Sequence, residues 1–288
     1  MIFAMPDDDA LSRSEYKKRI REDVHELRKI LAELRKKRHV WLILNGTEVG
    51  NKAILLIAPL LFRSIELIEA AIEDTKKGRL LSALSAVRTH YEVTGTMAMI
   101  LKKLRSHSAT DEKRREMVEF LKKMTLGVGK DYLKQYPNID VQNVHALDRI
   151  RCVDEVMPYE PDPSVKPTFL AYGDLCEYVH LNFSASHMTL EYHPANGTID
   201  LMDADKVWNL RARTMNWLSI SAGRFSLLHS EAMHWLEQHE RLPQTIKMPK
   251  YTHALQRFIG EAYLAVRLPL NRKGIWKIKK APDGTSHS

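Results

Sequence analysis

A single helix is predicted for the stretch Tyr172-Gly173-Asp174-Leu175-Cys176-Glu177-Tyr178-Val179-His180-Leu181-Asn182. Its apolar stripe, formed by Tyr172, Leu175, Cys176 and Val179, recurs at helical spacing, so one face is expected to pack in a core. On a second face, Glu177 precedes His180 by three residues. A carboxylate at that spacing can orient an imidazole ring and raise its affinity for a proton. The stretch therefore predicts either a proton-transfer site or an ordinary hydrogen-bonded histidine on a helix.

The composition is that of a soluble globular protein with a sizeable core. The chain has 288 residues, of which 44% are hydrophobic and 28% are charged, and neither fraction is unusual. The most apolar run, residues 53–62, contains Pro59 and is too short to span a membrane. The N-terminal residues lack the features of a signal peptide. We therefore expect no membrane segment, and the two cysteines favour a reducing, cytoplasmic setting.

The net charge of +8 favours anionic partners without identifying them. Basic residues gather on a predicted N-terminal helix that ends near Arg38, with Ser12 and Ser14 as candidate caps. A second basic group lies in residues 272–280. Each group predicts a nucleic-acid-binding surface. The alternative for the helix is a solvated helix that lies along a bundle or pairs with its twin in a dimer, and the alternative for the tail is a solvated, partly disordered segment.

The spacing of apolar residues along the rest of the chain predicts an all-α protein, a bundle of about seven helices. We expect a long basic helix in residues 1–42, the bundle core in residues 43–240, and a short helix with a basic tail in residues 241–288. Alternating residues near 187–202 surround the turn Pro194-Ala195-Asn196-Gly197 and predict a small β-hairpin before the last long helix. In the helix expected over residues 52–77, Pro59 should cause a kink or a break, and Gly78 should end it.

A helix expected from Arg79 to Leu104 contains many small residues, Gly95 among them, and should therefore pack closely at the centre. Arg88 and Glu92 lie one turn apart on it. An arginine on an apolar face needs partners, because its unpaired burial is costly. The pair can be an internal staple of the bundle or part of a functional site.

The two helices would form one site if they pack as neighbours. The residues that would then converge are Arg88, Glu92, Glu177, His180 and Asn182. This set suits a phosphodiester, because arginine neutralises the phosphate and histidine moves a proton to or from the ribose hydroxyl or the leaving oxygen. It equally suits a buried hydrogen-bond network that performs no chemistry.

Cofactors and metals are not expected. The 13 histidines include no pair at i, i+4 with a supporting carboxylate on the same face, as a helical zinc site needs. The chain also lacks a phosphate-binding glycine loop, a dinucleotide fingerprint and a nucleophile elbow. These absences disfavour P-loop nucleotide hydrolysis and Rossmann-type hydride transfer.

Two motifs resemble a group of uncharacterised bacterial helical proteins in the HEPN-like superfamily. The first is Arg-x-x-x-Glu after small and apolar residues, in Leu84-Ser85-Ala86-Val87-Arg88-Thr89-His90-Tyr91-Glu92, and the second is the stretch from Tyr172 to Asn182. The resemblance spans roughly residues 60–186. It implies an all-helical, frequently dimeric protein that binds RNA. The activity it implies is that of a metal-independent endoribonuclease in a bacterial defence or toxin system. Arg88, Glu92, His180 and Asn182 are the positions it carries over.

The nuclease signature of that superfamily is an arginine followed after four to six residues by a histidine on one helix. Arg224-Phe225-Ser226-Leu227-Leu228-His229 has this spacing, but Phe225 stands where the signature has a polar residue. The departure leaves a second hypothesis open, a non-catalytic interaction or scaffold protein such as the partner or antidote of a toxin. In that case the same polar residues would be structural.

Overall fold

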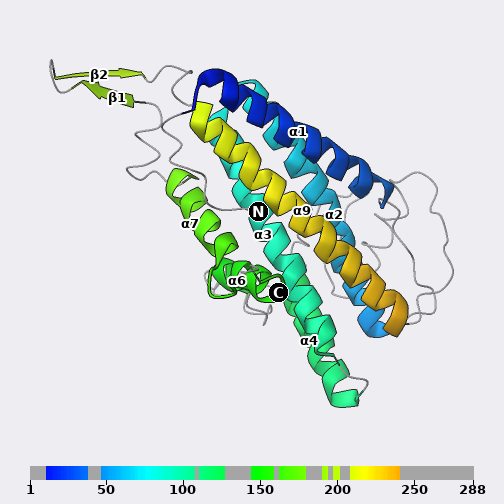
Figure 1. The fold of residues 1–288 in the computed structure, drawn as a ribbon. Helices are drawn as coiled ribbons and strands as arrows, with labels where there is room; N and C mark the ends of the chain where they lie inside the picture. Colours follow the sequence, from blue (N-terminus) through cyan, green and yellow to red (C-terminus); the bar gives the residue numbers. More distant parts are fainter. Residues whose placement is uncertain are drawn as a thin grey trace, which may run out of the picture. The chain divides into compact units, whose positions relative to one another are not determined.

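The computed structural model describes residues 11–37, 47–107, 110–126, 144–158, 162–179, 190–193, 197–201 and 208–240. All of them belong to one unit of the chain, Met1–Gln244. The helices in these ranges are α1 (Arg13–Lys36), α2 (Glu48–Lys76), α3 (Leu80–Arg105), α4 (Asp111–Leu126), α6 (Ala146–Val156), α7 (Pro167–Val179) and α9 (Trp208–His239) (Figure 1). The predicted all-α class is confirmed. The helix and basic tail expected in residues 241–288 lie outside the described residues.

The start of α1 follows from its cap. The Ser12 side chain accepts from the Glu15 amide, and Glu15 reaches back to the amide of Ser12, which satisfies two backbone donors reciprocally. Of the two serines considered, Ser12 is therefore the cap. Leu27, Leu31 and Leu34 are buried, and α1 packs against α9 and α2.

Helix α2 is longer than expected and is continuous. It begins at Glu48 because the Thr47 hydroxyl accepts from the Gly50 amide at 3.1 Å, a cap that the sequence interpretation overlooked. The helix runs through Pro59, so the alternative of a break there was wrong. Ile57 and Leu61, on either side of the proline, are buried, and this packing supports the helix where the proline removes a backbone hydrogen bond. Gly78 ends the turn with a φ of 74°, as predicted.

Helix α3 is the centre of the bundle, as its small residues predicted. It packs against α2, α4, α6, α7 and α9 (Figure 1). A Cβ on Gly95 would lie 2.8 Å from the backbone carbonyl of Arg149, so only glycine allows α6 to approach this closely. Among the described helices, none combines the length and apolar character that a membrane crossing needs.

Two short strands lie between α7 and α9. Strand β1 (Leu190–His193) pairs antiparallel with β2 (Thr198–Leu201), with Leu190 opposite Leu201 and His193 opposite Thr198. Gly197 has a φ of 66°, a value that favours glycine in a tight turn between strands.

A buried polar network joins α2, α3 and α9 inside the core. His90 is completely buried; its Nε2 lies 2.8 Å from the Ser64 hydroxyl, and its Nδ1 lies 2.8 Å from the Ser221 hydroxyl. Burial lowers the pKa of His90 to about 3, because the interior disfavours the charged ring. The imidazole is therefore neutral and fixes the register of three helices.

Candidate functional site

Arg88 and Glu92 face outward from α3 beside α7. Their side chains form an i, i+4 ion pair, with Arg88 Nη2 3.5 Å from Glu92 Oε1 and about a quarter of each side chain exposed (27% and 26%). Arg88 directly follows the buried Val87, and Glu92 lies between the buried residues Tyr91 and Val93. Both charges are thus partly withdrawn from water but remain accessible from solution.

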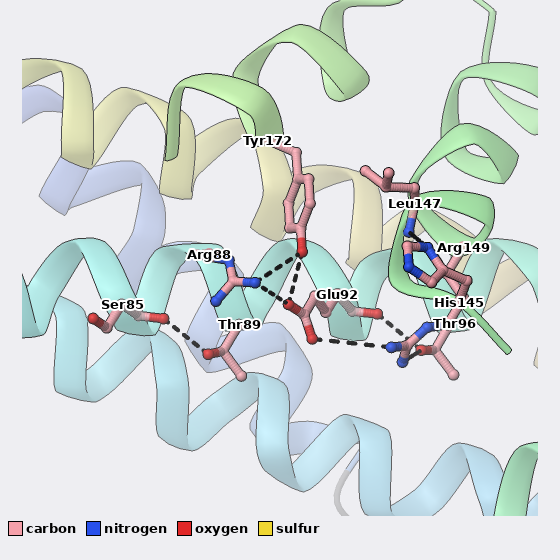
Figure 2. A network of polar contacts seen from close by, with 9 residues as sticks. All are labelled: Ser85, Arg88, Thr89, Glu92, Thr96, His145, Leu147, Arg149 and Tyr172. Carbon is pink, nitrogen blue, oxygen red and sulfur yellow. Dashed lines mark hydrogen bonds and ion pairs between the residues drawn. The ribbon is translucent and has the colours of Figure 1, made fainter. Parts of the chain in front are cut away.

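Tyr172 of α7 bridges the two charges. Its hydroxyl donates to Glu92 Oε1 at 2.9 Å and accepts from Arg88 Nη2 at 3.3 Å (Figure 2). Burial, and then the hydrogen bond to Glu92, raises the pKa of the Tyr172 hydroxyl. Tyr172 is therefore a neutral hydroxyl that donates to the carboxylate and binds the guanidinium.

A second arginine reaches Glu92 from α6. Arg149 Nη1 donates to the Thr96 hydroxyl at 3.1 Å, and Arg149 Nη2 lies 4.0 Å from Glu92 Oε2 (Figure 2). Its side chain is 18% exposed. We call Arg88, Glu92, Arg149 and Tyr172 the arginine–tyrosine cluster; it draws on α3, α6 and α7.

The charges in this cluster do not balance, because two guanidinium groups share one carboxylate. The Nε atoms of both Arg88 and Arg149 are buried, and neither has a hydrogen-bond partner in the described part of the chain. Burial lowers the pKa of Arg88, but hydrogen bonds to Cys176 and Tyr172 more than offset this, and the net shift is upward. A permanently charged pair of guanidinium groups with unused donors is suited to bind an anion such as phosphate.

A buried ion pair fixes the start of α7 and hence the position of Tyr172. Asp154 of α6 is fully buried and accepts from the backbone amides of Thr168 and Phe169 at 3.1 and 3.0 Å. Arg224 of α9 lies 3.4 Å from the same carboxylate and donates to the Thr168 hydroxyl. Asp154 thus caps α7 through the first free amides after Pro167.

The structure brings together some of the predicted site residues. Helices α3 and α7 do pack as neighbours, and Arg88 and Glu92 meet α7 at Tyr172. Glu177 is exposed; it follows Tyr172 by five residues, which turns it about 140° around the helix, away from the cluster. His180 and Asn182 lie outside the described residues, so their roles stay predictions.

Arg224 and His229 do not share a site. Five residues separate them on α9, so they point about 140° apart; Arg224 binds Asp154. His229 is buried, and its pKa is lowered to about 4 by burial and by Lys37, the residue after α1. These contacts give the two residues separate structural roles.

Sequence reasoning missed Tyr172 and Arg149 as site residues. Tyr172 was assigned to the apolar stripe. This assignment is correct for its ring, because the residue is only 2% exposed, but its hydroxyl makes polar contacts. The small residue Gly95, one turn beyond Glu92, signalled that another helix approaches there. It could not identify α6 as that helix, or Arg149 as the residue it brings.

Among the described residues, no group of three or more histidine, cysteine, aspartate or glutamate side chains is placed to hold a metal ion. Comparisons of the chain with protein-family models, curated proteins and solved structures give no match.

Proposed function

We propose that this chain is a HEPN-like helical protein that binds RNA, with the arginine–tyrosine cluster as its phosphodiester contact. The observation that carries the proposal is the approach of Arg88 and Arg149, from two different helices, to the single carboxylate of Glu92. One positive charge is left over in a half-buried site. A phosphate oxygen would neutralise it and accept from the partly exposed guanidinium groups.

In the catalytic form of this proposal, the protein cleaves RNA without a metal. The ribose 2′-hydroxyl loses its proton and attacks phosphorus; the P–O5′ bond breaks, and the 5′-oxygen takes up a proton. His180 acts as the acid/base, Arg88 neutralises the phosphate, and Glu92, Glu177 and Asn182 orient the reacting groups. Tyr172 holds Arg88 and Glu92 in place. As the resemblance implies, the protein would act as a homodimer in a bacterial defence or toxin system, and its two cysteines favour the cytoplasm.

The direct experiment is RNA cleavage with metals chelated, comparing the protein with its His180→Ala and Arg88→Gln variants. We expect both variants to lose cleavage while their melting temperatures stay unchanged. Arg63→Gln, which removes an exposed arginine from α2, is the control and should cleave normally. If the parent protein binds RNA but leaves it intact, the catalytic form is rejected and RNA binding is retained.

A second candidate function is supported by the same contacts. The cluster links α3 to α7 through Tyr172 and α3 to α6 through Arg149, as a structural staple of a non-catalytic interaction protein would. In that case Arg88→Gln and Arg149→Gln would lower the melting temperature, and the parent protein would not bind RNA.

A further inference from the structure

Trp208, the first residue of α9, has cations from two helices around its ring. The Arg211 guanidinium, one turn further along α9, lies 4.7 Å from the ring centroid. Lys17 Nζ and the Arg13 guanidinium, both from α1, lie at 5.2 and 5.5 Å. We call these four residues the Trp208 cluster; it uses none of the residues of the arginine–tyrosine cluster.

Two cations of this cluster, Lys17 and Arg211, differ from the lysines of α1 that are paired. Lys18, Lys29 and Lys36 each pair with a glutamate three or four residues away on the same helix. Lys17 and Arg211, by contrast, form no ion pair within the described ranges, and Arg211 Nε is buried there without a hydrogen-bond partner. Like charges held around one ring repel each other, and the indole face offsets this only in part.

The surroundings of the cluster add to its positive potential. Arg13 and Trp208 are the first residues of α1 and α9, so two helix N-termini lie at the same end of the bundle, each with a partial positive charge. Arg211 Nη2 lies 3.0 Å from the position of a Cβ on Gly78, which places this end next to the start of α3. Arg88 lies only about two turns further along α3.

We propose that the Trp208 cluster is a second binding site for the phosphate backbone of the RNA that contacts the arginine–tyrosine cluster. The inference rests on RNA as the ligand of that first cluster. Lys17 and Arg211 would contact phosphate oxygens, and the half-buried Trp208 ring holds both cations on the surface. A strand bound at both clusters is held more tightly than at either one, because the second contact is intramolecular.

The test is the salt dependence of binding to a fluorescein-labelled single-stranded RNA. We compare the full chain with the double variant Lys17→Gln/Arg211→Gln and with the control Lys18→Gln/Arg21→Gln, which removes the same charge from exposed positions of α1. The double variant loses two phosphate contacts, so it should bind RNA more weakly. The slope of the logarithm of the association constant against the logarithm of the salt concentration should fall in magnitude by about 1.4, or about 0.7 per contact. The control should leave the slope near that of the parent protein.

The outcomes separate this inference from the proposed function. If the control lowers the slope as much as the double variant, the cluster is not a site and the inference is overturned. If Arg88→Gln weakens binding and the double variant does not, RNA binding stands and the second site is rejected. If the double variant weakens binding and Arg88→Gln does not, the arginine–tyrosine cluster is rejected as the ligand site. If the parent protein binds no RNA, both the proposed function and this inference are overturned. If the double variant loses binding to phosphatidylserine vesicles but keeps its affinity for RNA, the Trp208 cluster binds a lipid surface and the inference is overturned.

Discussion

The hydroxyl of Tyr172 donates to Glu92 at 2.9 Å and so ties α7 to α3 at the candidate site. The same hydroxyl accepts from Arg88. One oxygen atom therefore sets the relative positions of a carboxylate and a guanidinium that lie on a different helix.

The first prediction concerns the Tyr172 hydroxyl. Tyr172→Phe keeps the buried ring and removes the donor to Glu92, so the free energy of unfolding should fall by about 1 kcal/mol. Chemical denaturation measures the change. Tyr178→Phe, on the same helix but outside the cluster, is the matched control. Equal effects of the two substitutions would mean that the hydroxyl of Tyr172 contributes no special contact.

The second prediction concerns the close contact of α3 with α6. Gly95→Ala places a methyl group 2.8 Å from the Arg149 carbonyl, and the forced shift of α6 should destabilise the protein by about 1–3 kcal/mol. Gly223→Ala is the control on α9, because nothing lies within 4 Å of its added Cβ. It should instead stabilise the protein, by about 0.5–1 kcal/mol. A neutral Gly95→Ala would contradict the described contact.

The third prediction concerns the buried Asp154–Arg224 pair. Asp154→Asn removes the buried negative charge and leaves Arg224 uncompensated, which should cost about 3 kcal/mol or more. Asp148→Asn, on the exposed face of the same helix, should change stability by less than about 0.5 kcal/mol. Hydrogen exchange should also become faster at the first amides of α7 in Asp154→Asn, because Asp154 caps them. Unchanged exchange there would rule out the capping role.

The fourth prediction is a loss of stability in acid. The folded-state pKa values of His90 and His229 are lowered to about 3 and about 4, whereas an unfolded histidine titrates near 6.5. Below pH 6.5 the unfolded chain therefore binds protons that the folded chain excludes. Stability should fall by about 1.4 kcal/mol per pH unit for each histidine, down to pH 4 for His229 and pH 3 for His90.

Denaturation at a series of pH values measures this slope. Between pH 4 and pH 6.5, the variant His229→Gln should show a slope of unfolding free energy against pH that is smaller by the contribution of one histidine. His234→Gln, at an exposed position of α9, should leave the slope unchanged. A slope that is the same in all three proteins would contradict the lowered pKa of His229. His90→Gln tests the lowered pKa of His90 in the same way. Its melting temperature at pH 8, where histidine is neutral in the folded and the unfolded chain, measures the packing lost by the substitution apart from the effect of proton binding.

Local sequence signals predicted most of the helices. Ser12 and Ser14 marked the start of α1, and Gly78 marked the end of α2, because caps and left-handed turns depend on a few adjacent residues. Pro59 was judged by its local effect alone. Burial of Ile57 and Leu61 outweighs that effect, and such tertiary packing is not visible in a local pattern.

The site was predicted only in part, because its contacts are not local. The spacing of Arg88 and Glu92 placed both on one face of α3, and the apolar stripe placed Tyr172 toward the core. That Arg149 would join them depends on how α6 crosses α3 at Gly95, a relationship between residues more than fifty positions apart. Helical periodicity gives the faces of each helix but not which faces meet.

The most direct test of the central claim is the RNA affinity of Arg149→Gln against that of Arg151→Gln, at one fixed salt concentration. Both substitutions remove one arginine from α6; Arg149 faces Glu92, and Arg151 is 56% exposed beside Asp148. If the arginine–tyrosine cluster contacts phosphate, Arg149→Gln should weaken binding about tenfold or more, as expected for a lost charge-assisted hydrogen bond, while Arg151→Gln binds like the parent. Equal affinities of the two variants, with equal melting temperatures, would contradict the account.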